Sequence, residues 1–438
     1  MKRVLFISYY FPPAGGSAVQ RVLKFVKYLP HFGWQPVVLT ARARDYVLWD
    51  DSLCSEIPAN VKIVRTPAPD LYRWYGKMEQ DMTMADLSAI AAGENKKIHL
   101  LKRLAIFIRA SCFIPDARIG WLPFALWEGL RIARREKIGI IFTTSPPFTT
   151  ALIGGLLSTL TKVPWISDYR DPWTQAYFYF SRPQCSQSLE NFLEKRLLYH
   201  TNRVISINHR ILNGLKEKYG IWESDKECVI PNGYDSEDFK GIEPVIDAYF
   251  TITYTGTLNT KMHPAPLLEA VAQLSEDRPE FGQKVRLNFI GRIGGDIVPM
   301  FQDKRIANKI KHIPHLPHRE CLRYTIGADL LLLLIPEWNN NELIMTGKLF
   351  EYLRSGVPIL CLSDRGDAAD VVRETGTGFT VCFRDVERIK DVLWKSFQSW
   401  IKGNDILKGP IRWDKVEAFD RKKGTEQLAR LLDEVEEN

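Results

Sequence analysis

Short apolar runs alternate with helical patterns along the whole chain. Most of the runs are continuous stretches of Val, Ile and Leu, which is typical of strands that are covered on both faces. Between them lie segments such as 18–29, where apolar residues recur at helical spacing. This alternation predicts an α/β fold with two successive doubly wound parallel sheets. The predicted strands are 4–8, 36–40, 61–65, 139–143, 164–167 and 203–207 in the first half, and 250–256, 285–291, 310–313, 328–335, 358–362 and 378–382 in the second.

The length of 438 residues is too great for one ordinary core and favours two domains. The stretch "IPNGYDSEDFKGIEP" (230–244) combines Pro, Asn-Gly and charged residues, as a turn and linker do. We therefore predict an N-terminal domain over 1–235, with a basic, aromatic insertion at about 70–137. A C-terminal domain would cover 236–407, followed by a charged helical tail over 408–438.

Composition excludes several classes of protein. A net charge of +7 favours an anionic partner but is too diffuse to indicate nucleic acid. The seven cysteines show neither CxxC nor His/Cys metal spacing, so we expect a reduced, cytoplasmic protein without a metal. GxGxxG is absent and the second strand ends in "VVLTAR" without an acidic residue, so we expect no NAD, FAD or other cofactor. The longest uncharged stretch, 138–161, is interrupted by two prolines, and its helical part is shorter than the ~20 residues that cross a bilayer.

Residues 96–137 hold ten Lys/Arg against three Asp/Glu, interleaved with Trp, Phe, Ile and Leu. Basic amphipathic helices with aromatic residues on the apolar side suit an anionic membrane surface. The alternative is a pair of helices that cover the sheet and expose basic outer faces. The segment thus suggests peripheral membrane contact without requiring it.

The stretch "TGKLFEYLRSGVPIL" (346–360) reads as a short helix that leads into a buried strand. Lys348 lies in the first turn, where the helix dipole already places partial positive charge, so a cation there is favourable only if an anion also binds. The free N–H groups near Thr346 and Gly347, with the Lys348 ammonium, would hold a diphosphate. Glu351, on the same face, would accept hydrogen bonds from ribose hydroxyls. The alternative is a simple i,i+3 salt bridge between Lys348 and Glu351.

Two further loops follow predicted strands and open helices. In "SYYFPPAGGSAVQRV" (8–22), Gly15, Gly16 and Ser17 would let a phosphate or carboxylate approach a helix start, or Ser17 would simply cap the helix. In "YTGTLNTKMHPAPLLEAV" (254–271), Gly256 is followed by a polar loop with Lys261. Ligands collect at the carboxyl ends of such strands, which predicts that Lys261 and Lys348 share one crevice. The alternative for Lys261 is a solvated loop lysine.

"SDYRDPW" (167–173) places Asp168, Arg170 and Asp171 just beyond a buried strand. Charges at this end of a strand face the ligand crevice, so Arg170 and Asp171 are candidate catalytic groups and Trp173 a candidate acceptor contact. An Arg–Asp pair that holds the loop is the alternative. The histidines of "HIPHLPH" (312–318) show no ligand spacing and read as a loop whose backbone would hold a base.

In order along the chain, "FPPAGGSAVQR", "SDYRDPW", "IPNGYD", "YTGTL", "FIGR" and "GKLFEYLRSGVPIL" resemble the family-4 glycosyltransferases of the GT-B fold. The phrase "IPDARIGWLPFA" (114–125) resembles a subgroup tied to surface polysaccharide synthesis. The resemblance implies two Rossmann-like domains that face each other across a cleft. It also implies retaining transfer of a sugar from a nucleotide donor, usually UDP-linked, to a saccharide or lipid-linked acceptor, without a metal.

The resemblance assigns donor binding to the C-terminal domain. Glu351 matches the ribose ligand, the second glutamate of the family's pair, and Lys348 matches a lysine of the same motif. The glycine loop would approach the diphosphate and the acceptor, with Gly16 on the donor side and Gly15 and Ser17 on the acceptor side. The tail would cross back to the first domain.

Several positions depart from the family pattern. Leu343 stands in place of the first glutamate, with Glu342 one residue away. Thr257 replaces an arginine, Lys261 comes one residue early, and Arg170 replaces a histidine. Two alternatives stay open: a GT-B epimerase of UDP-N-acetyl sugars, which shares the architecture, and a non-catalytic GT-B subunit, which these departures favour.

Overall fold

The computed structural model describes residues 1–42, 49–69, 113–175, 182–220, 226–314, 316–336, 341–407 and 409–437. The chain forms two compact units, the first from residues 1–231 with 422–438 and the second from residues 232–421. Residues 409–421, which the sequence analysis assigns to the tail, belong to the second unit, because 413–419 pack on its helices. Residues 70–112 of the predicted basic insertion lie outside the described residues.

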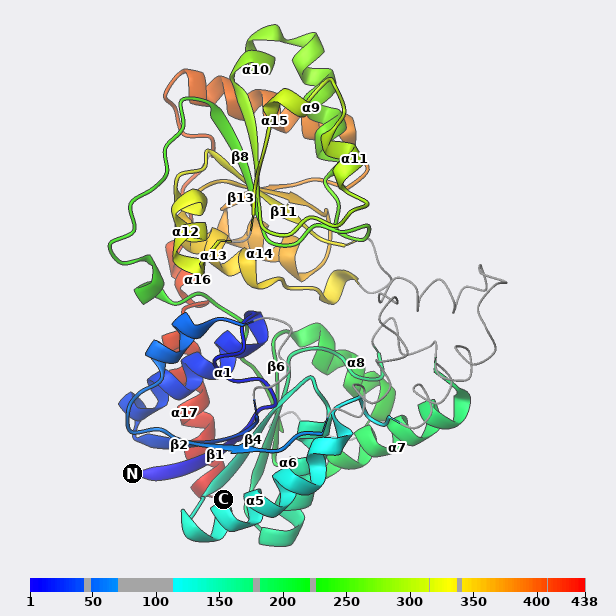
Figure 1. The fold of residues 1–438 in the computed structure, drawn as a ribbon, viewed down its shortest axis with the longest axis vertical. Coiled ribbons are helices and arrows are strands. Elements are labelled where there is room, and N and C mark those ends of the chain that lie inside the picture. Colours follow the sequence, from blue (N-terminus) through cyan, green and yellow to red (C-terminus); the bar gives the residue numbers. More distant parts are fainter. Residues whose placement is uncertain are drawn as a thin grey trace. The chain divides into compact units, whose positions relative to one another are not determined.

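The N-terminal unit is built on a parallel sheet of seven strands in the order β3-β2-β1-β4-β5-β6-β7 (Figure 1). The six strands predicted in this half are all present. The prediction missed β7, an edge strand of three partly buried residues that has no apolar run. The strands are β1 (Lys2–Ile7), β2 (Trp34–Ala41), β3 (Lys62–Thr66), β4 (Ile140–Ser145), β5 (Trp165–Tyr169), β6 (Arg203–Ser206) and β7 (Glu227–Val229).

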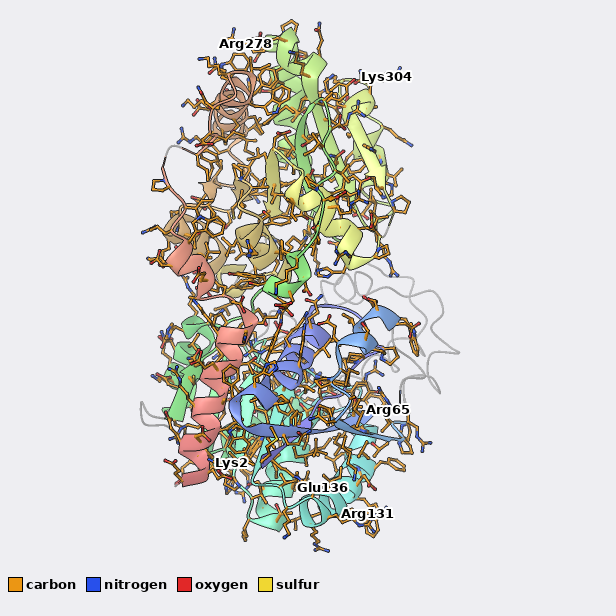
Figure 2. The ribbon with its side chains drawn as sticks, turned by 90° about the vertical axis from the view of Figure 1, so that its left-hand side faces the viewer. Lys2, Arg65, Arg131, Glu136, Arg278 and Lys304 are labelled. Carbon is orange, nitrogen blue, oxygen red and sulfur yellow. The ribbon has the colours of Figure 1, made fainter. Side chains whose placement is uncertain are left out.

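Helices cover both faces of this sheet. One face packs on α1 and α17, and Val4, Phe6 and Phe142 contribute to that core. On the other face, Thr143 lies against α6 so closely that a Cβ on Gly154 would come within 2.4 Å of it. Lys2 joins the start of β1 to α17 through ion pairs of 2.8 and 2.7 Å (Figure 2). The helices are α1 (Ser17–Tyr28), α5 (Leu122–Arg135), α6 (Thr149–Thr161), α7 (Gln184–His200), α8 (His209–Tyr219) and α17 (Arg421–Glu437).

The C-terminal unit has a parallel sheet of six strands in the order β10-β9-β8-β11-β12-β13. All six were predicted. The strands are β8 (Phe250–Thr255), β9 (Val285–Ile290), β10 (Ile310–Ile313), β11 (Leu330–Leu334), β12 (Ile359–Leu362) and β13 (Gly378–Thr380). The helices are α9 (Ala265–Asp277), α10 (Pro279–Lys284), α11 (Val298–Phe301), α12 (His318–Ile326), α13 (Gly347–Ser355), α14 (Asp367–Thr375), α15 (Val386–Ile401) and α16 (Trp413–Glu417).

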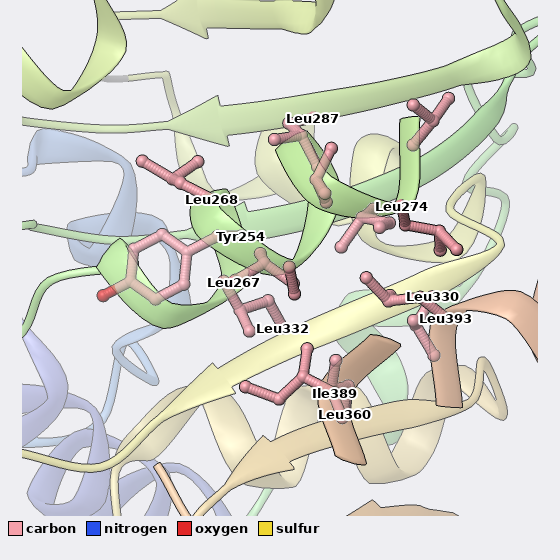
Figure 3. Packing of buried hydrophobic residues seen from close by; sticks show 14 of the residues in the cluster. Tyr254, Leu267, Leu268, Leu274, Leu287, Leu330, Leu332, Leu360, Ile389 and Leu393 are labelled. Carbon is pink, nitrogen blue, oxygen red and sulfur yellow. The ribbon is translucent and has the colours of Figure 1, made fainter. Parts of the chain in front are cut away.

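Strand β11 shows why continuous apolar runs predicted strands buried on both faces. Leu330, Leu332 and Leu334 belong to the core with α9 and α15, shown in Figure 3. Leu331 and Leu333 belong to the opposite core with α13, α14 and α16. Because successive side chains of a strand point to opposite faces, an all-leucine run fills both cores.

In each unit the strand order reverses at one point, between β1 and β4 in the first sheet and between β8 and β11 in the second. The loops at the carboxyl ends of these strands form the crevice in which doubly wound sheets bind ligands. The predicted site residues lie in these loops, in the helices α1 and α13 that follow them, and in the loop after β5. No helix in the described part of the chain is long and apolar enough to cross a membrane.

Candidate functional site

The first candidate site lies at the start of α13 in the C-terminal unit. Thr346 is the N-cap residue, but its side chain makes no capping hydrogen bond. Its buried Oγ1 has no hydrogen-bond partner among the described residues. The first N–H groups of a helix have no intrahelical acceptor, so α13 presents donors without a side-chain cap. Such a helix start is suited to an anion.

Lys348 extends from this first turn toward the end of β8. Its Nζ lies 2.7 Å from the hydroxyl of Tyr254 and 3.9 Å from the centroid of that ring. Burial lowers the pKa of the Lys348 ammonium to about 7, and the nearby Glu351 carboxylate opposes that shift. A partly buried amine without a bonded carboxylate is a cation that an anionic ligand would stabilise.

Gly256 makes room for this amine. It follows β8 with a φ of 127°, a conformation that favours glycine. A Cβ at this position would fall 2.7 Å from the Lys348 Nζ. The Gly256 N–H donates to the carbonyl of Ile290 at 2.8 Å, so the residue contributes open space rather than a donor. The sequence analysis identified the position, and the structure shows the steric reason for glycine.

Glu351 lies one turn further along α13. Its Oε1 is 2.9 Å from His318 Nε2, at the start of α12. Among the described residues, Lys348 and Glu351 do not form an ion pair within 4 Å, so the simple i,i+3 salt bridge considered from the sequence is absent. The sequence analysis placed His318 in a loop, but it is the first residue of α12. That the backbone of 312–318 holds a base stays a prediction. The Glu351 carboxylate remains partly exposed.

The other predicted donor residues occupy the loops around this point. Thr257 is exposed, and its carbonyl accepts a hydrogen bond of 3.0 Å from the Tyr254 hydroxyl. Lys261 lies in the turn from Asn259 to Met262, where the Asn259 side chain accepts from its N–H at 3.0 Å. Gly347 is the first residue of α13. Tyr254 was not predicted as a site residue, because a tyrosine at the end of a buried strand reads as core.

The second candidate site lies in the N-terminal unit, where the loop after β1 leads to α1. Gly16 is the N-cap, with a φ of 101°, and no side chain caps the helix. The alternative in which Ser17 caps the helix is therefore wrong, because Ser17 is already its first residue. Gly15 precedes this cap and is partly buried. The helix start is again open to an anion.

Asp168 is not available for chemistry in this unit. Its carboxylate forms a bidentate pair with Arg21, at 3.1 and 2.8 Å, and accepts 2.8 Å from the Thr144 hydroxyl. Arg21 and Asp168 are 2 % and 0 % exposed, so the pair is fully buried. An Arg–Asp pair does hold this segment, but the arginine comes from α1 and not from position 170.

Arg170, Asp171 and Trp173 line one pocket of about 380 Å³. Trp173 stacks on Phe148, with ring centroids 4.8 Å apart, and donates to Glu190 at 3.2 Å. Asp171 is exposed at the edge of the pocket. Three residues that the sequence analysis selected therefore lie in one pocket.

Several residues of this pocket were missed from the sequence. Asp116 accepts from the N–H and hydroxyl of Thr149, at 2.9 and 2.8 Å, and so neutralises the start of α6. Arg182 forms a 2.7 Å ion pair with Glu190. Asp116 was visible in the quoted phrase "IPDARIGW", whereas Arg182 and Glu190 lie in a stretch without a local signal.

Comparison with known proteins agrees with this architecture. Residues 88–238 match the family model described as Glycosyltransferase Family 4. No curated protein matches the chain. Sucrose-phosphate synthase from Thermosynechococcus elongatus is similar in structure, with a TM-score of 0.67, 14% identity and coverage of 99% of each chain.

Two other solved structures show the range of related proteins. A variant of S. aureus TarM, in complex with Fondaparinux, alpha-GlcNAc-glycerol and UDP, has a TM-score of 0.58 at 9% identity and covers 99% of this chain and 100% of its own. A putative UDP-N-acetylglucosamine 2-epimerase from Listeria monocytogenes has a TM-score of 0.56 at 11% identity, with coverage of 100% and 98%. Residues 88–238 are therefore similar to Glycosyltransferase Family 4, and the two parallel-sheet units have the GT-B fold.

Proposed function

We propose that the protein transfers a hexosyl group, with retention of configuration, from a UDP-sugar to a saccharide or lipid-linked acceptor in the synthesis of a surface polysaccharide. The observation that carries the donor assignment is the arrangement of Lys348, Gly256 and the uncapped start of α13. These groups place a cation, open space and free N–H donors at the carboxyl ends of β8 and β11, between which the strand order reverses. The structure of a TarM variant, a structural neighbour, contains bound UDP. This supports a nucleotide as the ligand of the present protein.

The proposed chemistry is electrostatic. When the bond from the sugar to the diphosphate breaks, negative charge builds on the leaving nucleoside diphosphate. The Lys348 ammonium and the first amides of α13 would stabilise that charge without reorganising, which is usually the largest contribution to such a rate. Glu351 would bind the ribose hydroxyls, and its contact with His318 would orient the carboxylate. These roles require no metal or other cofactor.

The acceptor is proposed to bind the N-terminal unit, in the pocket that Arg170, Asp171 and Trp173 line. Asp171 is the exposed carboxylate there and the candidate group near an acceptor hydroxyl. The uncapped start of α1, with Gly15 and Gly16 before it, would lie toward the substrates.

The direct experiment is a titration of the protein with UDP and with GDP, followed by incubation with UDP-sugars and saccharide acceptors. Micromolar binding of one nucleotide and acceptor-dependent release of it support the proposal. A folded protein that binds neither nucleotide would instead support the non-catalytic subunit.

An epimerase remains the second candidate, because two structural neighbours are UDP-N-acetylglucosamine 2-epimerases, one of them putative. The same incubation separates the two activities. An epimerase converts UDP-N-acetylglucosamine without any acceptor, whereas a transferase leaves the configuration at carbon 2 unchanged.

Protonation of Lys348 makes donor binding dependent on pH. Burial sets the pKa of the free amine at about 7, and a bound diphosphate would raise it. Binding therefore takes up about half a proton at pH 7 and close to one at pH 8, and the affinity falls by up to about tenfold per pH unit above 7. Calorimetric titrations at pH 8 in two buffers with different ionisation enthalpies measure this uptake. Equal observed enthalpies in the two buffers would contradict it.

The N-terminal unit also has an exposed apolar surface, here named the α5–α7 patch. Its large exposed side chains are Phe124, Trp127, Leu156, Leu160, Leu189, Phe192 and Tyr199. Helix α6 contacts both α5 and α7 (Figure 1). Exposed basic residues lie on the same helices, among them Arg134, Arg135, Lys195 and Arg196. Apolar and basic residues together suit an anionic lipid surface, which supports the proposed peripheral membrane contact.

Vesicle binding tests this patch. We expect the protein to bind vesicles that contain phosphatidylglycerol more tightly than vesicles of phosphatidylcholine alone, because anionic lipid attracts the basic residues. Trp127→Ser with Phe192→Ser should weaken binding by about tenfold or more, since each of the two side chains loses apolar burial. Trp49→Ser, which removes an exposed tryptophan from another part of the unit, is the matched control. Equal losses in the two variants would exclude the patch.

A further inference from the structure

Arg170 is a buried cation with few partners. The whole residue is 8 % exposed to solvent. The guanidinium Nη2 donates to the carbonyl of Pro146, and the main-chain N–H donates to the carbonyl of Ser145 at 3.0 Å. Nε is buried and has no hydrogen-bond partner among the described residues. Buried donors without partners are rare in folded proteins and call for an explanation.

Asp171 and Asp168 lie close enough to favour the Arg170 charge, but no carboxylate forms an ion pair with it within 4 Å among the described residues. Asp168 is held by Arg21 and Thr144, as described above. Asp116 accepts from Thr149 at the start of α6, and Glu190 is paired with Arg182. Asp171 is adjacent in sequence but exposed, and within the described residues it forms no ion pair with Arg170 at 4 Å or less.

A buried charge without a bonded counter-charge is costly for the unliganded protein. This cost is offset when an anionic ligand binds, because the ligand supplies the missing hydrogen-bond acceptors. An arginine is well suited to this role, since its planar fork matches carboxylate and phosphate oxygens. Arg21 is also buried in this unit, and it shows the contrast. The donors of its guanidinium are already bonded to the Asp168 carboxylate.

The surroundings of Arg170 indicate the size and nature of the ligand. The pocket of about 380 Å³ is at the lower end of the ~300–1,000 Å³ range of small-molecule sites. One wall is the stacked pair of Phe148 and Trp173. Tyr10, Arg118 and Arg182 also line the pocket and carry polar groups. A lining of aromatic and polar side chains fits one or two sugar rings better than a simple ion.

We infer that this pocket binds a saccharide that carries an anionic group, with the Arg170 guanidinium as the ligand for its carboxylate or phosphate. The inference rests on the proposed function and refines it, since it gives the acceptor a negative charge. A glycuronate and a sugar phosphate have this chemistry in common. The acceptor's charged group would then fix the sugar in the pocket.

Binding of small sugars to the full-length protein, measured by saturation-transfer NMR without any nucleotide, tests this inference. The probes are methyl glucuronide, glucose 6-phosphate, methyl glucoside and inorganic phosphate. We expect at least one acidic sugar to bind about tenfold or more tightly than methyl glucoside, because its charged group makes hydrogen bonds that the neutral sugar lacks. Preference for the glucuronide identifies a carboxylate acceptor, and preference for the sugar phosphate identifies a phosphorylated one.

Two variants locate the charge preference. Arg170→Gln should abolish it, whereas Arg131→Gln should retain it, because Arg131 lies on the outer face of α5 in an ion pair with Glu128 (Figure 2). Arg170→Lys, which keeps the charge without the fork, should retain part of it and serves if the glutamine variant does not fold. Equal binding of acidic and neutral sugars by the wild type would overturn the inference without any variant. Inorganic phosphate that binds as tightly as glucose 6-phosphate would overturn the saccharide assignment.

A titration of the same sample with UDP separates this inference from the proposed function. UDP binding without any preference for acidic sugars would overturn the acidic acceptor and leave the donor site in place. A charge preference that depends on Arg170, without UDP or GDP binding, would support the pocket and count against the transferase.

Discussion

Replacing Lys348 by Ala lowers the affinity for the nucleoside diphosphate by about 100-fold, or about 2.7 kcal/mol. The reason is the loss of a charge-assisted contact with the diphosphate in a partly buried site, where few other cations are available to replace it. The Tyr254 hydroxyl keeps its 3.0 Å hydrogen bond to the Thr257 carbonyl, so the variant should stay folded. Isothermal titration calorimetry with UDP and GDP measures the change directly.

Lys304→Ala is the matched control, because it removes an exposed lysine of the same unit, three residues beyond the end of α11 (Figure 2). It should leave the affinity unchanged. If Lys348→Ala binds the nucleotide as tightly as Lys304→Ala does, the donor assignment fails. Lys348→Arg should bind weakly as well, because a larger head group does not fit into the space beside Gly256.

Replacing Asp168 by Ala destabilises the N-terminal unit by about 3–5 kcal/mol. The substitution leaves the Arg21 guanidinium buried at 2 % exposure with only the carbonyl of Pro231, at 3.0 Å, as a strong acceptor. Differential scanning calorimetry should show the unfolding transition of this unit about 10 °C lower. Calorimetry is preferred because a chain with two units does not follow a single two-state transition.

Asp171→Ala is the control, since it removes an exposed aspartate from the same segment and should change stability by no more than about 0.5 kcal/mol. A double variant, Arg21→Met with Asp168→Leu, removes both charges and should recover part of the lost stability. Similar melting temperatures for Asp168→Ala and Asp171→Ala would show that the buried pair contributes little.

The strands were predictable because a strand buried on both faces consists of a continuous run of apolar residues. In β11, five leucines fill two cores, so no polar residue interrupts the pattern. β7 shows the limit of this signal, because Glu227–Val229 lies at the sheet edge with partly buried side chains and is held there by pairing with β6. A sequence carries no local record of such pairing.

The candidate site was predictable in part. The position of Lys348 at the wrong end of a helix dipole, and the glycine after β8, are features of local sequence. Their partners are not, since Tyr254 is 94 residues from Lys348 and His318 is 33 residues from Glu351. Contacts across such separations arise only when the strands order themselves in a sheet.

The charged residues at the end of β5 and just beyond it also depend on distant partners. From the sequence, Asp168, Arg170 and Asp171 all follow a predicted strand, and Arg170 and Asp171 are the candidate catalytic groups. In the structure, Asp168 is buried and paired with Arg21, which is 147 residues away in the sequence. Asp171 is exposed, and Arg170 lines a pocket. Which charge is neutralised and which is left for a ligand depends on what packs against each one.

By itself, then, the sequence determined the number of parallel strands but for one, the division into two α/β units, and the loops that carry the chemistry. These are consequences of hydrophobic periodicity and turn chemistry, which act over a few residues. Only the tertiary structure decided that Lys348 lies on Tyr254 beside Gly256, that Arg21 holds Asp168, and that Arg170 forms no ion pair within 4 Å among the described residues. Burial and pairing set the free energy of a charged group, and both depend on residues far away in the chain.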